Sequence, residues 1–287
     1  MKNKEKAKKL SKRVIALIIA GAIIGSILLC ALGFEIAFLV ADTIEVWSPD
    51  YEKTDLTEIL SKETLTDEDY EILYSQTGLT KVGIDRALMR GETGKKRIKD
   101  IQDEYFNDYT VENDLFAPYV CTDRLADGKS MLNTYLEKGD IIVTSSTHIS
   151  GFRIGHSGIV TNADLGRVMQ AMAYGTPTFE GRIGDFTSRV NFMILSVKCD
   201  GEIKSKAADF ARESYRGVPY SGFIGVFTKK ETTEKTQCAH LVWQAYREFG
   251  VDLDYNGGML ITPKDLANSP DVELVQVFGF DPVKLWK

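Results

Sequence analysis

The spacing of hydrophobic residues divides this chain into segments of different character. Residues 14–34, VIALIIAGAIIGSILLCALGF, form a run of 21 residues without a charge. A helix rises about 1.5 Å per residue, so this run spans about 31 Å, close to the ~30 Å hydrocarbon core of a bilayer. The apolar character continues to Val40, with Glu35 as the interruption. The pattern predicts a transmembrane helix over residues 14–40.

Two interpretations of this run are open, an uncleaved signal anchor and a cleaved signal peptide. Cleaved signals have a shorter apolar core of about 7–15 residues and a small-residue cleavage site, and the run fits neither feature well. We therefore favour the anchor. Residues 1–13 carry seven basic side chains and one acidic side chain, and basic flanks remain in the cytoplasm. We expect a single-pass cell-membrane protein with residues 1–13 as its cytoplasmic tail and residues 42–287 extracytoplasmic.

Residues 42–130 are polar and show helical spacing. Thr66 is suited to cap a helix that begins with three acidic residues, and Gly78 is suited to end it. Two further amphipathic stretches occupy residues 79–91 and 94–109. Narrow apolar stripes of this kind predict a helical stalk or small subdomain. Its role as a spacer, a partner-binding surface or a lid is left open.

The pattern changes to strands at about Leu136. Short β-branched or apolar runs predict strands over residues 139–146, 156–162, 167–175 and 191–199. An amphipathic helix is expected over residues 203–217, another beginning at Cys238, a third after Thr262 and Pro263, and a last strand over residues 272–278. Helices, then strands, then helices and a strand predict an α+β domain over residues 131–287 rather than alternating β-α-β units.

Composition and charge narrow the functional class. The chain has 287 residues, 44% hydrophobic and 26% charged, as in ordinary globular proteins. Its net charge is −6; residues 1–13 contribute +6, so the remainder carries −12. The basic end directly precedes the apolar run, so we expect no nucleic-acid partner. Neither C-x-x-C nor H-x-x-x-H occurs, and we predict no metal site.

Four cysteines are present. Cys30 lies in the apolar run, which leaves Cys121, Cys199 and Cys238 in the remainder. One interpretation pairs Cys121 with Cys199 and leaves Cys238 free. We favour the alternative that none of them is paired.

Cys238 opens the stretch CAHLVWQAYREFG, at the predicted start of a helix. Exposed N–H groups and the helix dipole stabilise a thiolate there, and a nearby imidazolium lowers the thiol pKa further. Leu241, Val242, Ala245 and Phe249 would anchor the far side of the helix in a core. The position therefore suits a nucleophile, although a buried structural cysteine fits the position alone equally well.

A nucleophilic cysteine needs a base, and the chain has three histidines. His156 opens an apolar strand between small neighbours and ranks first. His148 lies in a polar segment and ranks second, and His240 points to another face of the helix and ranks last. If the strand of residues 167–175 pairs beside that of His156, Gln170 is the inward polar residue that could orient the imidazole; otherwise it is a plain strand residue.

The ordered set GDIIV, HSGIVTN, MQA, GVPYSGF, QCAHLVWQAY and ITPKDLANSP resembles the YiiX-like group of the NlpC-type cysteine peptidase superfamily. This group is related to the lecithin retinol acyltransferase-like proteins. The resemblance covers about half the chain. It implies a circularly permuted papain-like α+β fold, an antiparallel sheet packed on helices, in which the histidine strand precedes the cysteine helix.

The resemblance also implies roles for particular residues. Cys238 would be the nucleophile, His156 the base and Gln170 the orienting group. Tyr220 matches the tyrosine of the group's GVPYSGF-like segment. Gln170 stands where relatives often carry an acid, and a neutral amide stabilises an imidazolium less.

Two further departures lie close to the expected site. Ser221 stands where aspartate is common, and His240 where glutamate is common. We expect Tyr220, Ser157 and Gln237 to contact the substrate. No cofactor is expected, because a thiolate, a base and backbone N–H groups suffice for acyl transfer.

These features predict a membrane-anchored extracytoplasmic cysteine amidase or peptidase acting on cell-wall peptides. The superfamily is rich in cell-wall hydrolases, but an acidic ectodomain argues against simple electrostatic binding to anionic wall polymers. One alternative is a lipid-directed acyltransferase or thiol esterase acting on a lipid-like acyl substrate. The other is an anchored binding module that has lost activity, which the substitutions Gln170 and Ser221 favour.

Overall fold

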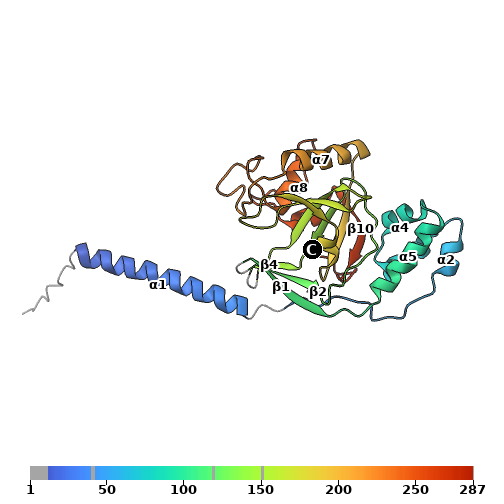
Figure 1. The fold of residues 1–287 in the computed structure, drawn as a ribbon, viewed down its shortest axis with the longest axis horizontal. Coiled ribbons are helices and arrows are strands. Elements are labelled where there is room, and N and C mark those ends of the chain that lie inside the picture. The colour runs from blue at the N-terminus through green and yellow to red at the C-terminus, as the bar shows by residue number, and fades with distance from the viewer. Residues whose placement is uncertain (1–11, 40–42, 118–119, 150–151, 287) are drawn as a thin grey trace, which may run out of the picture. The chain divides into compact units, whose positions relative to one another are not determined.

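The computed structural model describes residues 12–39, 43–117, 120–149 and 152–286 (Figure 1). The chain divides into two compact units, Met1–Asp42 and Thr43–Lys287. The second unit therefore contains both the predicted helical segment and the predicted hydrolase segment.

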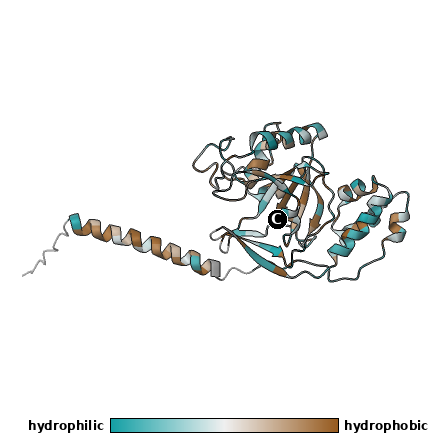
Figure 2. Ribbon diagram, viewed as in Figure 1, coloured by the Kyte–Doolittle hydropathy of each residue, from teal (hydrophilic) through white to brown (hydrophobic). Residues whose placement is uncertain are grey.

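The first unit contains the helix α1 (Lys12–Leu39), which confirms the predicted apolar helix. Hydrophobic residues cover it almost throughout (Figure 2). Its segment Lys12–Ala37 is long and apolar enough to cross a membrane. These properties suit a membrane anchor and a signal sequence alike. Residues 1–11 of the predicted cytoplasmic tail and residues 40–42 lie outside the described residues.

The second unit begins with the short helices α2 (Thr57–Ser61), α3 (Asp67–Thr77), α4 (Lys81–Leu88) and α5 (Glu92–Tyr105). The predicted ends of α3 are confirmed. The hydroxyl of Thr66 accepts from the N–H of Asp69, whose carboxylate accepts from the N–H of Thr66, and Gly78 ends the helix with a φ of 70°.

Residues 111–125 correct the expectation that the whole of 42–130 is helical. They form strands β1 (Val111–Ala117) and β2 (Val120–Leu125), which pair antiparallel. With β4 (Thr147–Ile149) and β5 (Phe152–Arg153) they make a four-stranded sheet in the order β1-β2-β4-β5. The sequence of β1, VENDLFA, contains Glu, Asn, Asp and Ala, which have low β-propensity. Cross-strand bonds, such as Arg124 Nε to Asp114 Oδ2 at 3.0 Å, help to hold the pair.

A six-stranded sheet forms the centre of the unit, in the order β10-β9-β3-β6-β7-β8, with every neighbouring pair antiparallel. Its strands are β3 (Ile141–Thr144), β6 (His156–Asn162), β7 (Arg167–Gln170), β8 (Phe179–Arg182), β9 (Phe192–Val197) and β10 (Val272–Phe278). The predicted strands are therefore present, but β7 stops at Gln170 rather than Gly175. Because β6 and β7 pair, the condition for placing Gln170 near His156 is met.

Helices cover both faces of this sheet. Ile141 points to a core shared with α7 (Gly201–Ser214) and α8 (Cys238–Arg247), and its neighbour Ile142 points to a second core shared with α3, α4 and α5. The alternation follows from the two-residue period of a strand. A buried ion pair from Arg86 to Asp140 (2.6 Å) joins α4 to the start of β3. The helices α3–α5 thus cover one face of the six-stranded sheet and share a hydrophobic core with it.

Candidate functional site

Cys238 is the first residue of α8, and Gln237 caps the helix. Oε1 of Gln237 accepts a hydrogen bond from the N–H of Ala239 at 2.8 Å and from the Cys238 thiol at 3.4 Å. Nε2 of Gln237 donates to the carbonyl of Ile261 at 2.5 Å, which fixes the capping amide. Every residue of α8 from Cys238 to Tyr246 is buried, and Arg247 ends the helix, so the thiol is held on a rigid element. Cys238 itself is 8% exposed.

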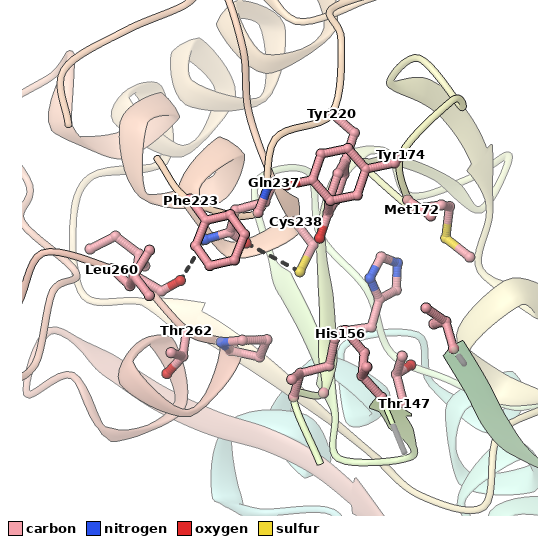
Figure 3. A pocket seen from close by; sticks show the side chains of 18 residues that line it. Thr147, His156, Met172, Tyr174, Tyr220, Phe223, Gln237, Cys238, Leu260 and Thr262 are labelled. Atoms are coloured by element: carbon pink, nitrogen blue, oxygen red, sulfur yellow. Dashed lines mark hydrogen bonds between the residues drawn. The ribbon is translucent and has the colours of Figure 1, made fainter. Parts of the chain in front are cut away.

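His156, on β6, is the imidazole that faces the same pocket as Cys238 (Figure 3). Its Nε2 lies 2.9 Å from Oε1 of Gln170. Nε2 of Gln170 in turn donates to Oδ2 of Asp185, at 2.7 Å, at the start of the short helix α6 (Gly184–Thr187). The three side chains form a chain of hydrogen bonds that runs from the pocket to a carboxylate behind it.

This chain of bonds fixes which proton His156 carries. A carboxylate only accepts hydrogen bonds, so Asp185 requires the NH₂ group of Gln170 and turns Oε1 of Gln170 toward the imidazole. Oε1 also only accepts, so Nε2 of His156 is the protonated nitrogen. Nδ1 is then left with a free lone pair, which is the state that a general base needs.

Gly181, on β8, provides the space for the bond between Gln170 and Asp185. A Cβ atom at Gly181 would lie 2.2 Å from Nε2 of Gln170 and 2.4 Å from Oδ2 of Asp185. Both distances are far below van der Waals contact. Any side chain at this position would therefore displace the orienting amide.

The surroundings of His156 keep its imidazole neutral. The ring stacks on Phe186, with the centroids 5.1 Å apart. Burial lowers the pKa of His156 to about 3, and the buried cation Arg189 acts in the same direction, whereas the hydrogen bond from Gln170 opposes them. Arg189 is held by the carbonyl of Asp185 (2.8 Å) and the hydroxyl of Thr147 (2.5 Å). The imidazole is a proton acceptor throughout the neutral range.

Burial also raises the pKa of the Cys238 thiol, while the N–H and hydroxyl of Ser157, the N–H of Ala239 and the charge of Arg189 lower it. The balance gives a neutral thiol beside a neutral imidazole at pH 7. Ser157 is fully buried, and its hydroxyl has no hydrogen-bond partner among the described residues. This position suits it to stabilise charge on the sulfur better than to contact a substrate.

The pocket in front of Cys238 has a volume of about 330 Å³. Figure 3 shows the thiol and the imidazole projecting into it, with Tyr220 and Gln237, expected to contact substrate, on its wall. Most of the remaining lining is apolar: Val120, Ile149, Ile154, Met172, Ala173, Tyr174, Phe223, Leu260, Ile261 and Pro263. The described part of the lining contains no carboxylate, lysine or arginine. The pocket is therefore suited to an uncharged, largely apolar group.

The other two histidines have structural partners. His148 is buried in the four-stranded sheet, 3.1 Å from Nδ2 of Asn113 and 3.5 Å from Oδ1 of Asp123. His240 lies on another face of α8, where Nδ1 meets the hydroxyl of Thr236 and Nε2 donates to the carbonyl of Lys230. His240 thereby ties the loop before α8 to the helix.

Asp185, Arg189 and the thiol-facing role of Ser157 were missed by sequence reasoning. Asp185 and Arg189 lie in a segment with no clear periodicity, so nothing in their spacing singled them out. Cys121 and Cys199 are not joined by a disulfide, and all four cysteines are free. Among the described residues, no cluster of three or more His, Cys, Asp or Glu is arranged to hold a metal ion.

Comparison with known proteins gives one distant similarity. A stretch of 135 residues, 46% of this chain, is 29% identical to the uncharacterized protein YycO of Bacillus subtilis. The chain spans about half of that protein's length, 52%. No protein-family profile and no solved structure matches the chain. The similarity assigns neither a family nor an activity.

Proposed function

We propose that this protein is a membrane-anchored, extracytoplasmic cysteine hydrolase that forms an acyl-enzyme on Cys238. The observation that carries the proposal is the convergence of a thiol at a helix start and a neutral, oriented imidazole in one pocket. The order of the histidine strand and the cysteine helix agrees with the permuted papain-like arrangement that the resemblance implies. An amide, ester or thioester carbonyl is the target of such a pair.

The mechanism follows from the protonation states. His156 Nδ1 accepts the thiol proton as the sulfur attacks the carbonyl carbon, after the thiol has turned away from Gln237. Backbone N–H groups at the start of α8, including that of Cys238, stabilise the oxyanion. The imidazolium then protonates the leaving group, and the same imidazole activates the water that releases the acyl group from the sulfur.

The lining of the pocket bears on the substrate class. Cell-wall stem peptides carry carboxylates and amines, for which the pocket has no charged partner among its described lining residues. A lipid-like acyl group is the second candidate substrate, and the apolar lining favours it. The non-enzymatic alternative is an anchored binding module without activity, and such a module requires no reactive thiol.

Alkylation of Cys238 by iodoacetamide across pH, followed by peptide mass spectrometry on the detergent-solubilised full chain, tests the proposal. Because His156 becomes protonated only near pH 3, we expect its assistance to persist from about pH 8 down to about pH 4. In His156→Ala the rate should follow the thiolate fraction and be about 100-fold lower at pH 7.

Cys121 and Cys199 serve as internal references, because neither lines the pocket and their rates should be the same in both proteins. Identical pH profiles for Cys238 in wild type and His156→Ala would exclude the proposed base. An inert Cys238 would leave the binding module as the better account.

A further inference from the structure

The pocket mouth is surrounded by exposed apolar side chains from separate parts of the chain. Ile154 precedes β6, Tyr174 follows β7, and Phe223 belongs to the loop before α8; all three line the pocket and are at least 40% exposed. Phe227 is 80% exposed and lies 5.6 Å from Phe223, ring centre to ring centre. Met259 is also exposed. We call these five residues the mouth patch.

The mouth patch is built on a fixed framework. At Gly225, a Cβ atom would lie 1.8 Å from the carbonyl oxygen of Met259, so the two backbones are in close contact there. The φ of 88° at Gly225 also requires glycine. On the other side, the hydroxyl of Tyr174 accepts a bond from the N–H of Gly222 at 3.0 Å. Phe223 therefore lies on a short segment that is held at Gly222 and at Gly225, and its side chain is exposed.

The chain that leads to α1 attaches beside one wall of the same pocket. The N–H of Ile44 donates to Oδ2 of Asp123 at 3.1 Å, and Arg153 donates to the same oxygen at 2.7 Å. Arg153 precedes Ile154 of the mouth patch, and the strand of Asp123 also supplies Val120 to the pocket. Only four residues of sequence separate Ile44 from Leu39, the last residue of α1. The covalent connection to α1 therefore enters the second unit at the carboxylate of Asp123, beside this wall of the pocket.

We propose that the mouth patch lies against the lipid bilayer, with Phe223 and Phe227 in its interfacial layer. Aromatic side chains are favoured at that depth because an apolar body can be buried while polar edges stay hydrated. An apolar pocket that opens on an exposed apolar rim would otherwise leave both in water. The pocket is then continuous with the membrane, and an apolar acyl group enters it without crossing water. This inference rests on the anchored state in the proposed function, but not on catalysis.

Lipid quenching of a single added tryptophan tests this arrangement in the full-length protein. The protein is reconstituted in phosphatidylcholine–phosphatidylglycerol vesicles whose acyl chains carry bromine. Phe227→Trp is compared with Met89→Trp, whose position is also 80% exposed but lies at the end of α4, on the other face of the sheet. The three native tryptophans are a common background.

In Phe227→Trp, we expect brominated lipid to quench at least about half of the fluorescence that the added tryptophan contributes, because interfacial residues reach ~5–10 Å into the acyl boundary. Met89→Trp should lose almost none. Adding Phe223→Asp to Phe227→Trp should restore the emission. Equal quenching in the two tryptophan variants would overturn the proposal and leave a protein partner or a soluble substrate to cover the patch. A protein that does not float with the vesicles would overturn it as well.

The outcome is separable from that of the alkylation experiment. Quenching at residue 227 with an inert Cys238 would retain the membrane contact and reject the hydrolase. A reactive Cys238 with an unquenched residue 227 would retain the hydrolase and reject the membrane contact.

Discussion

Replacing Cys238 by alanine is expected to reduce hydrolysis of an activated ester by at least about 1,000-fold, because removal of a covalent nucleophile leaves only binding and oxyanion stabilisation. Nitrophenyl esters of short and long fatty acids are suitable reporters, since the pocket accepts uncharged groups. The measurement is kcat/KM for the full chain in detergent. The longer ester should be the better substrate if the apolar lining holds the acyl chain.

Cys199→Ala is the matched control, because Cys199 is half-buried, is free, and lies outside the pocket lining. It should retain near-wild-type kcat/KM. Removing the sulfur of Cys238, at the start of α8, costs on the order of 1 kcal/mol of folding stability, so Cys238→Ala should still fold. Hydrolysis retained in folded Cys238→Ala would show that this cysteine is not the nucleophile.

Much of the fold was predictable where local signals and long-range packing agree. Thr66 and Thr262 each precede an acid by three residues, and both form the capping boxes that this spacing predicts. Strand β8, with the sequence FEGR, was not predicted. The other five strands of the central sheet lie in the apolar or β-branched runs that predict them, and the helix at Cys238 begins where it was predicted. In these segments the sequence pattern and the tertiary contacts require the same structure.

The strands at residues 111–125 were not predictable for the opposite reason. Their side chains include Glu112, Asn113 and Asp114, which disfavour strands by themselves. The buried carboxylate of Asp123 helps to hold β2 in place. It accepts hydrogen bonds from Ile44, Asn113 and Arg153, which belong to three other segments. A contact of that kind depends on the completed fold, and no local pattern reports it.

In the candidate site, too, some features were predictable from local sequence and others depend on the packed fold. The strand start ranked His156 first among the candidate bases and the expected strand pairing made Gln170 its possible partner, whereas the three roles together were implied by the resemblance. The structure brings Cys238 and His156 to one pocket and Gln170 to 2.9 Å from His156. The electrostatics of the site could not follow from local sequence. Arg189 is fully buried near the site, and its charge together with burial favours a neutral imidazole, so a preformed thiolate–imidazolium pair is disfavoured. Burial and buried charge are properties of the packed interior.

Asp185 is the residue whose replacement should most directly test the orientation of His156. In Asp185→Ala, the NH₂ group of Gln170 loses its acceptor, and the amide is free to rotate and donate to Nε2 of His156. The imidazole would then carry its proton on Nδ1, facing the thiol, and could not act as the base. We expect kcat/KM to fall by about 10–100-fold, by analogy with the loss when residues that orient metal-binding histidines are removed.

A control and a spectroscopic measurement separate this positioning role from a loss of folding. Asp185→Asn keeps an oxygen that can accept from Gln170, so it should lose less activity than Asp185→Ala, and Asp164→Asn, at an exposed turn, should lose none. The ¹⁵N shifts of the His156 ring should report a proton on Nε2 in the wild type and a shifted population toward Nδ1 in Asp185→Ala. An unchanged tautomer in a folded Asp185→Ala would mean that Gln170 is held by packing against its strand neighbours, and that the carboxylate has no part in orienting the base.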